Sequence, residues 1–127
     1  MNKFLIIEDN KMMAKILAEL LRKSIPVQKL LYAPTAQQAY NTLLKSKVDC
    51  IFLDLNLCKP LDGIEVLQYI RTQYPSLPVV IVTGDSEMET VKRVISHNPN
   101  DYLVKPLSMH KVQRCLEKLG IFQPSDT

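Results

Sequence analysis

The sequence predicts an α/β fold in which the five strands of a parallel sheet alternate with five helices. Short apolar runs alternate along the chain with segments whose apolar residues recur at spacings of three and four, in units of about 25 residues. The runs are apolar almost throughout, which is typical of strands buried on both faces of a sheet. Strands that alternate with helices in this way form parallel sheets with right-handed crossovers.

The first two units each combine a strand with a capped helix. Residues 3–7 form the first strand, and Asn10 is expected to cap the helix that follows. The apolar face of this helix comprises Met13, Ile16, Leu17, Leu20 and Leu21. Residues 27–33 form a less regular second strand, and Thr35 is expected to cap the second helix. The apolar face of the second helix comprises Ala36, Ala39, Tyr40, Leu43 and Leu44.

The third strand, residues 50–53, consists of apolar residues only and ends abruptly at the carboxylate of Asp54. A helix is predicted over residues 61–74, with an apolar face of Ile64, Leu67 and Ile70. The fourth strand covers residues 78–82, and another helix is predicted over residues 86–97. The apolar face of that helix comprises Met88, Val91, Val94 and Ile95.

The last unit is a short strand over residues 102–104 and a helix over residues 108–119 that stops at Gly120. The side chains that this helix is expected to bury are Val112, Cys115, Leu116 and Leu119. We therefore expect one domain over residues 1–122 and a disordered tail over residues 123–127.

The composition excludes several classes of function. With 127 residues, of which 46% are hydrophobic and 23% charged, the chain resembles an ordinary globular domain. No apolar run approaches the roughly 20 residues that span a bilayer, and the N-terminus lacks a signal-peptide pattern, so we expect a cytoplasmic protein without a membrane partner. The net charge of +3 is spread along the chain, which argues against direct nucleic-acid binding. The three cysteines, Cys50, Cys58 and Cys115, have no metal-like spacing and are expected to be reduced thiols.

Polar residues that could carry chemistry follow four of the predicted strands: Glu8 and Asp9, then Asp54, Thr83 and Lys105. In a flavodoxin-like, doubly wound sheet with strand order 2-1-3-4-5, strands 1 and 3 are neighbours at the switch point, so the three carboxylates should converge. Carboxylates this close raise one another's pKa unless a cation lies nearby, and oxygen ligands of this kind suit Mg²⁺. A lysine and a hydroxyl beside Mg²⁺ are typical of sites that hold a transferring phosphoryl group.

Each of these residues also has a simpler structural interpretation when it is taken alone. Asp54 fits a loop cap, Thr83 fits a helix cap or turn residue, and Lys105 fits an ion-pair partner for the carboxylates. Tyr102, in the short fifth strand, fits a half-buried packing residue. Their occurrence together at the strand ends favours the site.

The combination also matches the pattern of a known family. The residues that carry the match are Glu8-Asp9, Asp54, Asp62-Gly63, Thr83-Gly84, Tyr102 and Lys105-Pro106. In this order and at these strand ends, they resemble a response-regulator receiver domain of two-component signalling, similar to the single-domain chemotaxis type. The resemblance covers about residues 3–119.

The resemblance implies an acceptor and a metal site. Asp54 would accept a phosphoryl group from a phosphohistidine of a histidine kinase or phosphotransfer protein, and the reaction would depend on Mg²⁺. Asp9 and Asp54 would bind the Mg²⁺ ion directly, and Glu8 would bind it through water. Asn56 would contribute its backbone carbonyl.

The resemblance also implies a switch. Lys105 would bind the phosphoryl oxygens through a cis Lys105-Pro106 peptide, Thr83 would rotate toward these oxygens, and Tyr102 would move between exposed and buried rotamers. The output would be protein binding by the face formed by the fourth helix, fifth strand and fifth helix. The partner would be a downstream protein or an output domain missing from this chain. The protein would assist its own phosphorylation and dephosphorylation without being a turnover enzyme.

One departure from the family and two alternatives remain. The segment from Asp54 to Gly63 has one residue more than the usual family spacing, which places an insertion near Cys58. A Mg²⁺-dependent phosphohydrolase with an aspartate nucleophile is the alternative function, but it would need an acid at the position of Asn56. A flavin binder would need a phosphate loop rich in glycine, serine or threonine after the first strand, where Glu8 would instead repel a phosphate. The sequence fits both a stand-alone regulator and a receiver from a longer protein.

Overall fold

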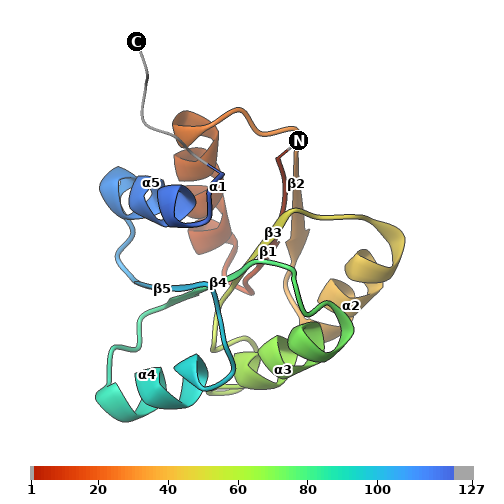
Figure 1. Ribbon diagram of the computed structural model, residues 1–127, viewed down its shortest axis with the longest axis vertical. Coiled ribbons are helices and arrows are strands. Elements are labelled where there is room, and N and C mark those ends of the chain that lie inside the picture. Colours follow the sequence, from red (N-terminus) through yellow and green to blue (C-terminus); the bar gives the residue numbers. More distant parts are fainter. Residues whose placement is uncertain (1, 122–127) are drawn as a thin grey trace.

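The computed structural model describes residues 2–121 and contains the predicted flavodoxin-like sheet, with five parallel strands in the order β2-β1-β3-β4-β5 (Figure 1). The strands are β1 (Lys3–Ile7), β2 (Lys29–Ala33), β3 (Cys50–Leu53), β4 (Val79–Thr83) and β5 (Asp101–Val104). The helices are α1 (Lys11–Ser24), α2 (Ala36–Lys45), α3 (Gly63–Gln73), α4 (Met88–Ile95) and α5 (Met109–Lys118). The predicted tail, residues 123–127, lies outside the described residues.

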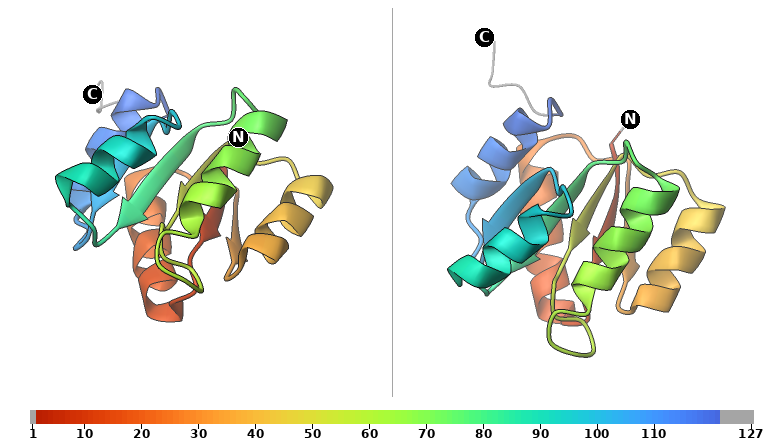
Figure 2. Two further views of the ribbon diagram at one scale, coloured as in Figure 1. Left: turned by 90° about the horizontal axis from the view of Figure 1, so that it is seen from below. Right: turned by 60° about the horizontal axis from the view of Figure 1, so that its bottom comes forward.

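The helices form two layers, with α1 and α5 on one face of the sheet and α2, α3 and α4 on the other (Figures 1 and 2). The strands supply side chains to both layers in alternation, because successive residues of a strand point to opposite faces. In β1, Phe4 and Ile6 pack under α1 and α5, while Leu5 and Ile7 pack under α2, α3 and α4. The uniform apolar character of the central strands thus follows from burial on both faces.

The predicted helix caps at Asn10 and Thr35 are confirmed. The Asn10 side chain accepts a hydrogen bond from the Met13 N–H at 3.0 Å, and the Thr35 hydroxyl accepts one from the Gln38 N–H at 3.1 Å. Each cap satisfies an N–H group that has no partner within its own helix.

The predicted start of α3 is wrong. This helix begins at Gly63 rather than at residue 61. Leu61 has a φ of 62°, which lies in the left-handed region and cannot belong to a right-handed helix. Residues 59–62 instead complete the loop that leads from β3 to α3.

The predicted apolar faces are wrong at one position each in α1 and α2 and at two positions in α4. The residues found exposed are Ile16, Leu44, Met88 and Ile95. In α1 the buried stripe contains Ala14 and Ala18, whose small side chains let the helix approach the sheet and turn Ile16 outward. In α4 the buried pair is Thr90 and Val94. The spacing pattern was based on large apolar residues, so it did not predict the burial of Ala14, Ala18 and Thr90.

Two further observations concern the class of protein. No helix within residues 2–121 is long and apolar enough to cross a membrane. All three cysteines are free, with Cys50 and Cys115 buried and Cys58 exposed. Burial raises the pKa of the Cys50 thiol to about 12, so this group stays protonated and unreactive at neutral pH.

We predict that two adjacent leucines of α2 contribute very differently to stability. Leu43 is 7% exposed and Leu44 is 74% exposed. Leu43→Ala should lower the free energy of unfolding by about 2–5 kcal/mol, because it empties part of the core. Leu44→Ala should change it by less than about 0.5 kcal/mol. Urea denaturation of both variants measures the difference, and equal losses would contradict the assigned orientation of α2.

Candidate functional site

The register of the sheet brings four strand ends to one edge. Ile7 of β1 pairs with Leu53 of β3, and Thr83 of β4 pairs with Val104 of β5. The residues that follow these pairs therefore emerge at the same edge from neighbouring strands. This is the edge at which parallel α/β sheets form their binding sites.

Three carboxylates meet at this edge. Glu8, Asp9 and Asp54 each offer one oxygen, and these oxygens lie within 4.8 Å of one another. Asp54 is buried, Glu8 is half-buried and Asp9 is exposed. Lys105 enters from the end of β5, with its Nζ 2.8 Å from Glu8 Oε1 and 3.4 Å from Asp54 Oδ2. The structure thus brings together the carboxylates and the lysine that the sequence singled out.

The cluster carries more negative charge than Lys105 neutralises. Burial, together with the hydrogen bond and the charge of Asp54, raises the pKa of Glu8 to about 7 against the opposing effect of Lys105. Burial alone would lower the pKa of Lys105, but its hydrogen bond with Glu8 and the charge of Asp54 outweigh this and raise it. The lysine therefore stays charged, while the carboxylates remain crowded.

The donor set fits a hard divalent cation. All three groups are carboxylates, and neither a thiol nor an imidazole belongs to the cluster. Oxygen-only ligands with an exposed side open to water are the arrangement that Mg²⁺ prefers. A cation would also relieve the repulsion between Glu8 and Asp54, which adds to the effect of burial in raising the pKa of Glu8.

Asn56 lies next to this cluster. Its N–H donates a hydrogen bond to Asp54 Oδ1 at 3.2 Å, while its side-chain Oδ1 accepts one from the Leu61 N–H at 2.7 Å. The two oxygens of Asp54 are thus held from different directions, one by this N–H and the other by Lys105. The Lys105-Pro106 peptide is cis, as predicted.

Thr83 and Tyr102 are connected through a residue that the sequence analysis missed. Thr83 is buried, and its hydroxyl accepts a hydrogen bond from the Asp85 N–H at 3.4 Å. The Tyr102 hydroxyl donates to the Asp85 carbonyl at 2.7 Å. Burial and the charge of Asp85 both raise the pKa of Tyr102, so its hydroxyl remains a donor at neutral pH. The backbone of Asp85 thereby joins the two residues.

The contacts that the sequence did not predict are those of Asp85, whose backbone binds the side chains of Thr83 and Tyr102, and those of Asp62, whose side chain binds backbone groups. The carboxylate of Asp62 accepts hydrogen bonds from the N–H groups of Leu57, Cys58 and Lys59. For Asp62 the available signal was its place before Gly63 in a long loop. For Asp85 no pattern of spacing indicated the contact, because it depends on how the loop after β4 turns.

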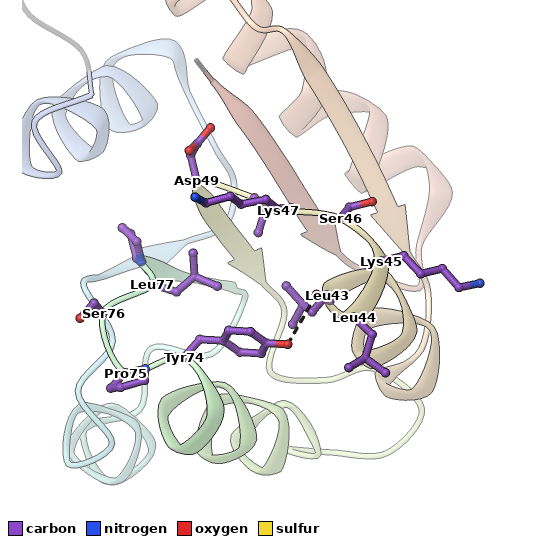
Figure 3. A pocket seen from close by; sticks show the side chains of 12 residues that line it. Leu43, Leu44, Lys45, Ser46, Lys47, Asp49, Tyr74, Pro75, Ser76 and Leu77 are labelled. Carbon is purple, nitrogen blue, oxygen red and sulfur yellow. Dashed lines mark hydrogen bonds between the residues drawn. The ribbon is translucent and has the colours of Figure 1, made fainter.

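Two surface grooves lined by residues within 2–121 differ in their relation to the carboxylates. One, of about 690 Å³, lies at the opposite edge of the sheet between the α2–β3 and α3–β4 connections, where the Tyr74 hydroxyl donates to the Leu43 carbonyl at 3.5 Å (Figure 3). It contains none of the predicted site residues. The other, of about 620 Å³, borders Glu8 and Asp9 and is lined also by the exposed side chains of Met12 and Tyr32.

A flavodoxin-like sheet with a lysine and three carboxylates at its switch point is typical of phosphoacceptor domains. The sequence profile of the response regulator receiver domain matches residues 4–117, and the chain belongs to this family. It is a receiver domain of two-component signalling. Members of the family are phosphoacceptors rather than classical enzymes, and histidine kinases or phosphotransfer proteins phosphorylate them.

Individual relatives agree with this assignment. The chain is 32% identical over 114 residues to the transcriptional regulatory protein ZraR of Klebsiella oxytoca, and the match covers 90% of this chain and 25% of ZraR. It is 27% identical over 116 residues to the probable C4-dicarboxylate response regulator DctR of Bacillus subtilis (strain 168), covering 91% of this chain and 51% of DctR. The chain thus spans a quarter to a half of the length of these curated relatives. The Mn(2+)-bound form of response regulator Rcp1 matches with a TM-score of 0.80 at 25% identity over 98% of each chain.

Proposed function

We propose that this receiver domain is a Mg²⁺-dependent switch in which Asp54 accepts the phosphoryl group. The observation that carries the proposal is the placement of this buried carboxylate, 3.4 Å from Lys105 Nζ and within 4.8 Å of oxygens of Glu8 and Asp9. Asp9 is exposed, and Glu8 is bound to Lys105 at 2.8 Å and to the Asn10 N–H at 3.3 Å. The resemblance to the family places the acceptor at the end of the third strand, where Asp54 lies.

In this proposal an oxygen of Asp54 attacks the phosphorus of a phosphohistidine, the P–N bond breaks, and the imidazole leaves as an acyl phosphate forms. The Asn56 N–H and Lys105 hold the carboxylate in place, so little reorganisation is needed before attack. Lys105 also stabilises the negative charge on the transferring oxygens. The groove beside Glu8 and Asp9 gives a donor protein access to this edge of the sheet.

The residues proposed to hold Mg²⁺ are Glu8, Asp9, Asp54 and, through its backbone carbonyl, Asn56. When bound, the ion would supply positive charge between the acceptor and the phosphoryl oxygens. The metal-bound structure of the similar protein Rcp1 supports a divalent cation in this family member as well. Exposed Asp9 and half-buried Glu8 leave room for the water ligands that Mg²⁺ retains.

We further propose that the signal leaves the site through Thr83 and Tyr102. If the Thr83 hydroxyl turns toward a phosphoryl oxygen, it releases the Asp85 N–H, and Asp85 is the residue that also binds the Tyr102 hydroxyl. The affected surface would be the α4–β5–α5 face, with Lys92, Gln113 and Arg114 as candidate contacts. Its partner would be a downstream protein or an output domain outside this chain, as the greater length of ZraR suggests.

The alternative function, an aspartyl phosphohydrolase, finds no support in the geometry. Such an enzyme would need an acid two residues after its nucleophile. That position is occupied by Asn56, whose amide oxygen accepts the Leu61 N–H and is committed to the loop. An amide cannot exchange the proton that hydrolysis would require.

We predict that Asp54 is the sole site of phosphorylation. Incubation with acetyl phosphate and Mg²⁺ should add one phosphoryl group to the wild-type protein and none to Asp54→Ala, as measured by intact-protein mass spectrometry. Asp49→Ala is the matched control, because Asp49 lies at the opposite edge of the sheet, and this variant should be phosphorylated normally. Phosphate on Asp54→Ala would show that another residue is the acceptor.

We predict that Asp9 is a Mg²⁺ ligand. Asp9→Asn removes one anionic ligand, while its exposed position keeps the cost to folding small, so most of the Mg²⁺ affinity should be lost without a change in the melting temperature. Titration of backbone amide shifts by NMR measures the affinity. An unchanged dissociation constant in this variant would remove Asp9 from the site.

We predict that Thr83→Ala uncouples the output face from the acceptor. Asp54 should still accept a phosphoryl group, because its contacts to Lys105 and Asn56 do not involve Thr83. The amide shifts of residues 86–118 that beryllofluoride, a phosphoryl mimic, induces in the wild type should be much smaller in the variant. Equal shifts in the two proteins would contradict the proposed route.

A further inference from the structure

The loop between β3 and α3 closes onto the backbone of the acceptor. The Gly63 N–H donates a hydrogen bond to the Leu55 carbonyl at 2.7 Å. A side chain at Gly63 would clash with the Asp54 carbonyl oxygen and would place its Cβ 2.6 Å from Leu55 Cα. The loop in between, which projects at the bottom of the right-hand view of Figure 2, therefore begins and ends at the same point.

Inside this loop, the Asp62 carboxylate binds three successive backbone N–H groups. Its Oδ1 accepts from Leu57 at 2.7 Å, and its Oδ2 accepts from Cys58 at 2.9 Å and from Lys59 at 3.1 Å. Hydrogen bonds to an ionised acceptor are stronger than neutral ones, and successive N–H groups form a favourable site for an anion. Although Asp62 precedes α3, its side chain makes no capping bond to that helix. The hydrogen bonds of this carboxylate therefore stabilise the loop rather than the start of the helix.

The shortest of these bonds fixes a particular peptide group. The Leu57 N–H and the Asn56 carbonyl belong to the same peptide, which is planar and trans, so they point in opposite directions. When Asp62 holds the N–H on one side, the carbonyl is directed to the other. An acceptor on the N–H also increases the negative charge on the carbonyl oxygen, which makes it a better ligand for a cation.

We propose that Asp62 is a positioning residue of the metal site, which orients the Asn56 carbonyl by binding the N–H of the same peptide. This proposal rests on the proposed function, in which that carbonyl is a Mg²⁺ ligand. It assigns to a residue outside the carboxylate cluster a direct effect on cation affinity. The Asn56 side chain reinforces the same loop through its bond to the Leu61 N–H.

The test compares Asp62→Ala, Asp62→Asn and a matched control, Asp49→Ala. Asp49 is also an aspartate that accepts a backbone hydrogen bond, from the Lys3 N–H at 2.8 Å, but it lies at the opposite edge of the sheet. Mg²⁺ dissociation constants are measured by NMR titration, and melting temperatures are measured without metal. Partners that orient a metal ligand usually change affinity by about 10- to 100-fold when they are removed.

Asp62→Ala should weaken Mg²⁺ binding by about 10- to 100-fold, and Asp62→Asn should weaken it less, because the amide keeps one acceptor oxygen. Asp49→Ala should leave the affinity unchanged even where it lowers the melting temperature. Unchanged affinity in Asp62→Ala would overturn the proposal. Equal losses in the two Asp62 variants would also overturn it, because they would show an effect of charge alone. If Asp62→Ala does not fold, Asp62→Asn is compared with Glu65→Gln, which removes a charge from the first turn of α3. Weakened affinity in Asp62→Asn alone supports the proposal, whereas unchanged affinity in Asp62→Asn, or equal losses in the two variants, overturns it.

The outcome is separable from that of the proposed function. If Asp9→Asn binds Mg²⁺ as the wild type does, the metal site itself is wrongly assigned. If Asp9→Asn loses affinity and Asp62→Ala does not, the metal site stands and only the role of Asp62 fails.

Discussion

The register of β1 against β3 is the constraint on which the site depends. Phe4 of β1 and Phe52 of the neighbouring strand β3 both lie in the layer under α1 and α5. Their rings pack edge to face, with ring centres 5.8 Å apart. A slip of one residue would turn Phe52 toward the other layer, because side chains alternate along a strand. The same slip would carry Asp54 away from Glu8. Packing in the core therefore fixes the geometry of the carboxylates, although none of them contributes to the core.

This rigidity is what allows the chain to hold an unfavourable arrangement of charge. Carboxylates that were free to move would separate, and here burial, the hydrogen bond with Asp54 and the charge of Asp54 all raise the pKa of Glu8. Lys105 offsets part of the repulsion from a neighbouring strand end. The repulsion that remains favours a bound cation. The packing of the sheet thus holds the carboxylates in an arrangement that favours binding of a cation.

The sequence predicted the strands, their order, two helix caps and the residues that meet at the sheet edge, because each follows from a local pattern and from strand ends that share one edge. It did not predict that Ile16 would be exposed, since the burial of Ala14 and Ala18 is decided by how closely α1 approaches the sheet. It also missed the hydrogen bonds of Asp62 and Asp85. These join side chains to backbone groups whose directions are set by the path of a loop, and the extra residue near Cys58 made one of those paths unpredictable.

The two loops that flank Asp54 differ in how firmly hydrogen bonds hold them in place. The β3–α3 loop is closed at its base by Gly63 and is held internally by Asp62. The extra residue expected near its exposed tip should therefore not displace Asp54. In the β4–α4 loop the Asp85 carboxylate accepts a single backbone hydrogen bond, from the Glu87 N–H at 2.9 Å. The Asp85 backbone is joined to Thr83 by a long hydrogen bond from its N–H and to Tyr102 by a short one to its carbonyl. The helix that follows buries only Thr90 and Val94 and has no side-chain cap. Segments with few buried contacts open at the lowest free energy, so in the proposed switch a change at Asp54 would be transmitted more readily through the β4–α4 loop and α4 than through the β3–α3 loop.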